Sequence, residues 1–218
     1  MRRRSLLLSA VFAATTAHAA VTGSGTAARE ARAVGDFQAI ELRGDIDLVV
    51  RQSGRTAVEV QADDNLLARV ETEVIDGRHG RTLRIGWRRD ESVRPRAPTV
   101  VTVDVAQLRA VASSGSGDVR IDALTTPLFS LALAGSGDAR LARLSIDELS
   151  VSIAGSGDVS AQDLAAEEVK VSVAGSGDAR VHAERELTVA IAGSGDVVYS
   201  GAAAVKSSIA GSGSVRKR

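Results

Sequence analysis

The chain has 218 residues, with 27 basic and 27 acidic side chains, no cysteine and only 2% aromatic residues. The balanced charge argues against nucleic acid as a partner. The lack of cysteine excludes both a disulfide framework and a lipid anchor on an N-terminal cysteine. A compact β-sandwich usually depends on aromatic side chains for core volume, whereas a stacked solenoid can fill a narrow core with Val, Ile, Leu and Ala.

The N-terminal residues have the pattern of an export signal. Three arginines at positions 2–4 precede a short apolar stretch (5–16), and Ala17-His18-Ala19 supplies a small-x-small cleavage pattern. These features predict a signal peptide over residues 1–19, and its arginines fit both the general and the twin-arginine export routes. The apolar stretch is shorter than the about 20 residues of a membrane-spanning helix. We therefore expect a mature chain that starts at Ala20 and does not span a membrane.

The mature chain is expected to begin with a flexible linker (20–32) and to continue as one domain over residues 33–218. Removing the three signal arginines leaves 24 basic side chains (27 minus 3) against 27 acidic ones, a net charge of −3. Residues 33–104 alternate apolar and polar positions between turn signals such as Ser53-Gly54 and Asp76-Gly77, which predicts a less regular β-rich part. Within it, Gly44-Asp45-Ile46 echoes Gly-Asp-Val steps found later and suggests a degenerate coil.

Residues 105–218 contain a short repeat. Gly-Ser-Gly-Asp occurs at 115–118, 135–138, 155–158, 175–178 and 193–196, and a last copy reads Gly-Ser-Gly-Ser at 211–214, so the spacings are 20, 20, 20, 18 and 18 residues. Apolar residues alternate on both sides of each copy, as in Leu149-Val151-Ile153 and Val159-Ala161, which is strand patterning. One unit cannot bury its apolar face alone, so the repeat predicts an all-β fold with a right-handed parallel β-helix (solenoid) of 18–20 residues per coil.

The motif predicts a tight corner between two strands. Glycine permits positive φ and close approach of a neighbouring backbone, and Ser and Asp can bond nearby backbone amides. Stacking would align one carboxylate per coil at about 4.8 Å spacing. Neighbouring carboxylates repel by on the order of 1 kcal/mol in water, so backbone amides or a cation should offset the charge. The aligned residues are Asp118, Asp138, Asp158, Asp178 and Asp196.

Two interpretations of this column of aspartates stay open. Stacked carboxylates and glycyl carbonyls could supply the six to eight oxygen ligands of calcium. Alternatively the aspartates cap the corners, which one carboxylate per coil favours. Apart from calcium, no cofactor is expected.

Other candidate residues have weaker patterns. One stretch is rich in arginine and could contact anionic envelope polymers, with arginines at positions 78, 81, 84, 88, 89, 94 and 96. Asp90 and Glu91 interrupt this stretch, so a solvated face is the simpler interpretation. Arg43-Gly44-Asp45 spells a cell-adhesion tripeptide inside a strand-like alternation, which indicates coincidence. His79 and His182 are isolated and lack metal-ligand spacing. Charge in Val215-Arg216-Lys217-Arg218 is expected to discourage stacking on the last coil.

The order of the motifs along the chain resembles the auto-transporter adhesin head GIN domain family. These motifs are Phe37-x-x-Ile40, Gly44-Asp45-Ile46, Val58-Glu59-Val60, the stretch 72–77, Leu83-x-Ile85 and the repeated Gly-Ser-Gly-Asp. The similarity covers residues 35–216. It implies a right-handed β-helix in a bacterial envelope protein, without catalytic residues to carry over.

We therefore expect an exported protein of a Gram-negative bacterium, periplasmic, secreted or at the cell surface. The expected function is non-enzymatic: an adhesin or structural binding module whose partner is an envelope polysaccharide or a surface protein. A polysaccharide-active lyase or hydrolase is the alternative, because such enzymes use β-helices. They need a cleft with a converging acid and base, whereas the acids here are evenly distributed.

Overall fold

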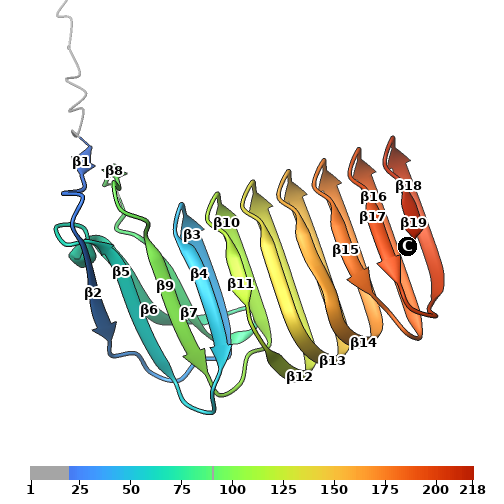
Figure 1. Ribbon diagram of the computed structural model, residues 1–218, viewed down its shortest axis with the longest axis horizontal. Coiled ribbons are helices and arrows are strands. Elements are labelled where there is room, and N and C mark those ends of the chain that lie inside the picture. Colours follow the sequence, from blue (N-terminus) through green and yellow to red (C-terminus); the bar gives the residue numbers. More distant parts are fainter. Residues whose placement is uncertain (1–19, 90) are drawn as a thin grey trace, which may run out of the picture.

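The computed structural model describes residues 20–89 and 91–218, so the predicted signal peptide (1–19) lies outside the described residues. Almost all regular structure is β, in strands β1 to β19, and one short 3-10 helix, η1, covers Leu67–Arg69. Figure 1 shows the coils stacked side by side along the long axis of the molecule, with the last coil at the opposite end from β2. The predicted all-β solenoid is confirmed.

Each coil contributes one strand before its corner and one after it, and equivalent strands pair in parallel. Strands before the corners are β3 (Ala39–Gly44), β10 (Ala110–Gly115), β12 (Leu124–Gly135), β13 (Ala139–Gly155), β14 (Val159–Gly175), β16 (Glu186–Gly193) and β18 (Ala204–Gly211). Strands after them are β4 (Asp47–Gln52), β11 (Val119–Ile121), β15 (Ala179–His182), β17 (Val197–Ser200) and β19 (Val215–Lys217), together with the first residues of β13 and β14.

The register places identical motif residues above one another. Gly115 pairs with Gly44 on one side and with Gly135 on the other. The same alignment continues from Gly155 through Gly175. The corner at residues 44–47 therefore belongs to the stack and precedes the six motif copies, as the degenerate-coil prediction required.

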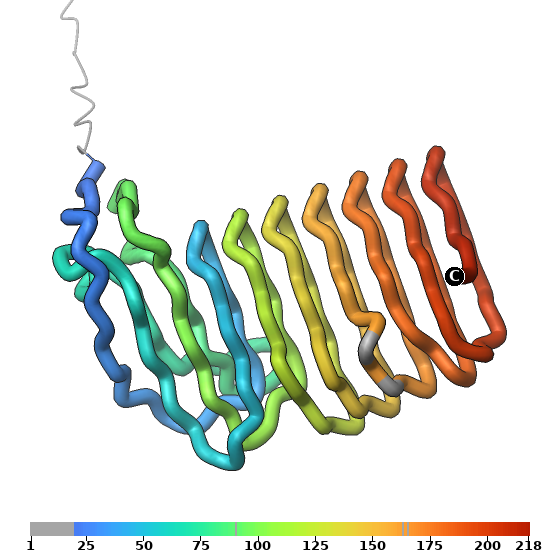
Figure 2. Tube along the Cα trace, viewed as in Figure 1, coloured from blue at the N-terminus to red at the C-terminus, as the bar shows by residue number. Residues whose placement is uncertain are grey.

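The space beside the first coil is occupied by strands that come later in the chain. These are β7 (Gly80–Trp87), parallel to β3, and β9 (Val100–Val105), parallel to β4. Figure 2 shows this departure from chain order, because the cyan segment lies between two green ones. Antiparallel strands then cover that end: β6 (Val70–Gly77) on β7, β5 (Ala57–Asp63) on β9, and β2 (Ala27–Arg32) on β5.

The prediction of a flexible linker over residues 20–32 is wrong. It contains β1 (Val21–Thr22), which pairs in parallel with β8 (Val93–Arg94), and it also contains β2. Burial of Asp63 explains why the segment is fixed: its Oδ1 accepts the amide of Gly25, and its Oδ2 accepts the amides of Arg96 and Ala97. Burial raises the pKa of Asp63, but the amide donors together lower it below its ordinary value.

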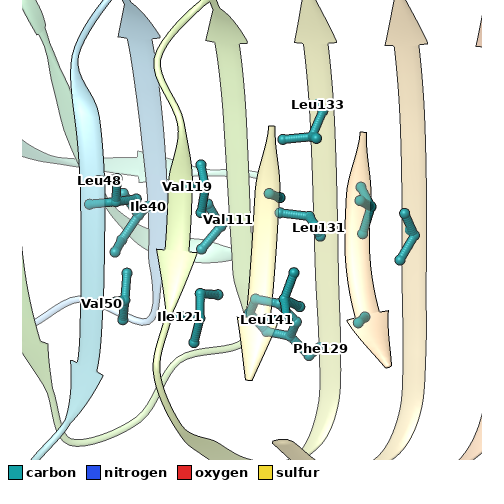
Figure 3. Packing of buried hydrophobic residues seen from close by; sticks show 14 of the residues in the cluster. Ile40, Leu48, Val50, Val111, Val119, Ile121, Phe129, Leu131, Leu133 and Leu141 are labelled. Atoms are coloured by element: carbon teal, nitrogen blue, oxygen red, sulfur yellow. The ribbon is translucent and has the colours of Figure 1, made fainter. Parts of the chain in front are cut away.

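The core is a narrow aliphatic layer between the strands before and after the corners. Figure 3 shows side chains of successive coils in this layer, among them Ile40, Val111 and Leu131 from one side and Leu48 and Val119 from the other. Every second residue of the strands points inward because side chains alternate along a β-strand. Among the described residues, no strand pairs with the outer side of the last coil, and Ile209, aligned with buried Ile191, is 42% exposed.

Candidate functional site

The corners bring the coil backbones into contact, and this contact explains both glycines of the motif. Gly135 has a φ of 134°, and a Cβ there would overlap the carbonyl oxygen of Gly115. A Cβ on the second glycine, Gly137, would likewise overlap the carbonyl oxygen of Gly117. The six motif corners repeat this arrangement, so only glycine allows these coils to stack at their normal spacing.

The motif aspartates form a column whose carboxylates bond the next coil. Oδ1 of Asp118 accepts the backbone amide of Asp138 at 2.9 Å, and Oδ1 of Asp138 accepts that of Asp158 at 2.9 Å. The series continues to Asp178 and Asp196, and ends where Asp196 accepts the amide of Ser214. Backbone amides thus supply the offset that a column of like charges requires.

The column begins one coil earlier than the sequence suggested. Asp47 accepts the amide of Asp118 at 3.0 Å, which makes it the first member of the aspartate column. The sequence comparison aligned Gly44-Asp45 with the Gly-Asp step of the motif, but the structure aligns Gly44 with the first glycine and so Asp47 with the aspartate. The four-residue spacing Gly44-x-x-Asp47 carried this signal, and Ile46 in place of the second glycine hid it.

At the last member of the column, hydrogen bonds lower the pKa of Asp196. The hydroxyl of Ser214 donates to Oδ1 of Asp196 at 2.8 Å, the Ser214 amide donates to the same oxygen, and burial partly opposes them. Arg216 lies 3.4 Å from Oδ2 and acts in the same direction. This carboxylate is therefore held in its charged form by the coil that follows it.

The five calcium candidates, Asp118, Asp138, Asp158, Asp178 and Asp196, all lie in this column, each with Oδ1 bonded to an amide. Among the described residues, no group of three His, Cys, Asp or Glu side chains is placed to hold one metal ion. The corner-capping interpretation accounts for the geometry, and calcium binding stays a prediction.

Arginines form a second column beside the aspartates. Arg120 pairs with Arg140 in the neighbouring coil, Arg140 pairs with Ser160, and Ser160 pairs with Arg180. All three arginines are exposed. Sequence inspection missed this column, although each arginine follows a motif aspartate by two residues and so lies on the same face of its strand.

The two columns line an open groove of about 690 Å³ that runs across the stacked coils, called the axial groove here. Its charged lining residues are Asp47, Asp118, Asp138, Asp158, Arg120, Arg140 and Arg180. The lining thus contains four carboxylates and three guanidinium groups, and none of the described residues that line the groove is aromatic. The surface offers hydrogen-bond acceptors and donors in rows, repeated at the coil spacing of about 4.8 Å.

The tripeptide Arg43-Gly44-Asp45 is used within the fold. Arg43 donates to Glu41 at 2.6 Å, and Asp45 accepts the indole N–H of Trp87 at 2.6 Å. Burial raises the pKa of Glu41, and its bonds to Arg43 and to Arg84 lower it overall.

The remaining sequence candidates are dispersed. The predicted basic stretch is spread over the β6–β7 turn, β7, β8 and the loops that flank β8. The structure therefore does not gather it into one patch. His79 is exposed at the β6–β7 turn, and His182 contacts Ser200 at 2.9 Å and Glu184 at 2.6 Å. The structure does not bring the two histidines together.

The repeated corner and the coil before it agree with a known family. Residues 36–159 and 145–203 match the family described as putative auto-transporter adhesin, head GIN domain. The chain belongs to this family. The resemblance predicted from the motif order is thus confirmed, and membership in the head GIN family makes an adhesin-like role the relevant functional class. A comparison with curated proteins gave no match.

Solved structures share the head GIN fold. A putative adhesin from Bacteroides fragilis NCTC 9343 is 23% identical with a TM-score of 0.73, over 91% of this chain and 100% of that one. A putative adhesin from Parabacteroides distasonis ATCC 8503 is 26% identical with a TM-score of 0.58, over 91% and 99%. A putative lipid binding protein from the same strain is 24% identical with a TM-score of 0.64, over 91% and 99%.

Proposed function

We propose that this head GIN protein is an exported, non-enzymatic adhesin-like module of the bacterial envelope, and that it contacts its partner through the axial groove. The observation that carries the proposal is the pair of charged columns, because they repeat the same acceptors and donors over successive coils. Repeated shallow contacts suit an extended partner, such as an envelope polysaccharide or a surface protein, better than a small metabolite.

Export is supported by the N-terminal pattern and by the family. The sequence of residues 1–19 has the charge, apolar stretch and cleavage pattern of a signal peptide. In the described part of the chain, no helix has the length and apolar character needed to cross a membrane. We place the protein in the periplasm or at the surface of a Gram-negative bacterium, where an adhesin meets its partner.

The second candidate is a polysaccharide-active enzyme, because a groove along stacked coils could hold a glycan. Such an enzyme needs one carboxylic acid with a raised pKa to protonate the leaving group. Among the residues that the structure describes, the carboxyls whose pKa departs from the ordinary value all shift downward: Glu41, Asp63, Glu186 and Asp196. The bonded Oδ1 atoms of the column serve the backbone, which favours a binding surface over an acid–base pair.

A binding assay with groove variants tests the proposal. Purified protein is screened against immobilised glycans and surface-protein preparations, and each positive is repeated with the triple variant Arg120→Gln, Arg140→Gln, Arg180→Gln. Loss of binding in this variant is expected. The matched control changes the exposed Arg78, Arg88 and Arg89, which removes the same charge outside the groove. Equal effects of both variants would contradict the groove as the contact surface, and release of reducing sugar from a bound glycan would favour the enzyme.

A further inference from the structure

The two charged columns of the axial groove do not neutralise each other within one chain. Among the described residues that line the groove, no aspartate forms an ion pair with an arginine. Each of these aspartates instead uses Oδ1 to accept an amide of the next coil, as Asp138 does from Asp158. Arg120 donates to Asp122 at 2.6 Å, on the side away from the aspartate column. Opposite charges thus lie side by side, and each retains bonding capacity for a group outside the chain.

The columns have a fixed geometry relative to each other. The aspartate and the arginine of one coil are two residues apart, as Asp138 and Arg140 are, so they lie about 7 Å apart on the same face of the strand. Both columns run along the solenoid axis with the coil spacing of about 4.8 Å. The groove therefore presents two parallel lines of opposite charge at a constant separation.

This pattern is complementary to itself under one particular symmetry. Half a turn about a line midway between the columns, parallel to the solenoid axis, places each aspartate column opposite the arginine column of a second copy. The rotation leaves the level of each coil unchanged. The pairs that result, each formed twice, are Asp118 with Arg120, Asp138 with Arg140 and Asp178 with Arg180 of the second copy. A two-fold axis across the solenoid would instead place aspartates opposite aspartates, at an electrostatic cost.

Coils without an arginine are compatible with the same arrangement. Asp158 would face Ser160 of the second copy, whose hydroxyl can donate. Arg216 already lies 3.4 Å from Asp196 within the chain, and only Asp47 would gain no donor. An acidic polymer would meet the aspartate column and a basic polymer would meet the arginine column, each with repulsion. A second copy in this orientation avoids both.

We propose that the axial groove binds a second copy of this chain, with the two solenoid axes parallel and the coils in register. This inference rests on the proposed function and names the surface-protein partner, because the adhesin-like module then joins copies of itself. Exposed ion pairs are individually weak, but pairs repeated at one spacing act together. The association is accordingly transient and sensitive to salt.

Sedimentation of the purified full protein over a range of concentrations at low salt measures the association. The protein is expected to dimerise, and salt at about 0.5 M should dissociate the dimer. The triple variant Arg120→Gln, Arg140→Gln, Arg180→Gln should raise the dissociation constant about tenfold or more with an unchanged melting temperature. The matched control, Arg78→Gln, Arg88→Gln, Arg89→Gln, removes the same charge outside the groove and should dimerise normally.

Cross-linking tests the orientation of the two copies, since the described chain has no cysteine of its own. Val49→Cys and Val198→Cys place single thiols at the two ends of the arginine column. The two positions are five coils apart, about 24 Å. A short bismaleimide added to a mixture of the two variants should join like positions, Val49→Cys to Val49→Cys and Val198→Cys to Val198→Cys. Products that join only unlike positions would show antiparallel copies and overturn the proposed arrangement.

The outcomes separate this inference from the proposed function. A protein that stays monomeric, yet binds a glycan or another protein in a way that the groove arginine variant abolishes, overturns the inference and leaves the proposed function standing. A dimer that the groove arginine variant and the control weaken equally, or not at all, also overturns the inference. If neither self-association nor the binding of any screened partner depends on the groove arginines, both proposals fail.

Discussion

The steric requirement for glycine at the corners predicts a large loss of stability on adding a single methyl group. Gly155 has a φ of 136°, and a Cβ there would overlap the carbonyl oxygen of Gly135 in the preceding coil. Gly157 has the same overlap with Gly137, but its φ is outside the left-handed range. Gly54 has a φ of 75° with no atom near the added Cβ. Substituting alanine at each of the three separates backbone strain from stacking.

The expected magnitudes follow from these differences. Gly54→Ala introduces only an unfavourable φ, which costs about 1–2 kcal/mol. Gly157→Ala forces two coils apart and weakens the bonds from the amides of Gly157 and Asp158 to the preceding coil, at 3.3 and 2.9 Å. Two or three such hydrogen bonds amount to roughly 2–4 kcal/mol. Gly155→Ala combines both effects and should lose the most, about 3–6 kcal/mol.

Urea unfolding followed by circular dichroism measures the three free energies of unfolding. A solenoid is stabilised by contacts between neighbouring coils, so the corner variants should also show a smaller denaturant slope or a second transition as the last coils detach. Equal destabilisation by all three substitutions, or a loss at Gly157 no larger than that at Gly54, would refute the role assigned to close coil contact.

Four further outcomes follow from the carboxylates and from the last coil. Asp138→Ala should lower the free energy of unfolding by about 0.5–1.5 kcal/mol, because the Asp158 amide loses its acceptor, and Asp138→Asn should recover most of it; equal losses would contradict the capping role. The pKa of Asp63 is lowered in the folded state, so its stabilisation is complete above its unfolded pKa of about 3.9 and is lost as pH falls through the lower folded value. Asp63→Asn should therefore reduce the melting temperature at pH 7 and flatten its decline in acid, which a pH series of thermal scans would check. Millimolar calcium should leave the melting temperature unchanged, and a clear rise would favour a metal site in the aspartate column. Deleting residues 216–218 should promote self-association at the exposed strand β18, and an unchanged sedimentation profile would count against charge as the protecting factor.

The repeat predicted the corners because its spacing equals the coil length, and alternation predicted which side chains fill the core. Both are local signals. The arrangement beside the first coil could not be predicted in this way, because β7 and β9 reach their positions through pairings between segments distant in the chain. The segment 20–32 was misjudged for the same reason: its order depends on buried Asp63, a contact that no local pattern reports.

Within the site, the aspartates were predictable and their partners were not. A carboxylate in a turn signals that it caps something, but the acceptor of the Asp158 amide belongs to Asp138, 20 residues away. Asp47 escaped notice because Ile46 replaces the second glycine in the first corner. The arginine column required the register between coils, since Ser160 interrupts it in the sequence.

The glycine, serine and aspartate positions of the motif differ in what the fold demands of them. Glycine is fixed by the approach of two backbones, and aspartate is fixed by an amide in the next coil, so their repetition follows from stacking. The serine between the two glycines contributes its backbone amide to the stack, as where Ser136 donates to the carbonyl of Gly115 at 3.0 Å. Because stability in a solenoid depends on neighbouring coils, a coil can be added without disturbing the others. The axial groove, whose lining residues run from Asp47 to Arg180, accordingly crosses several successive coils.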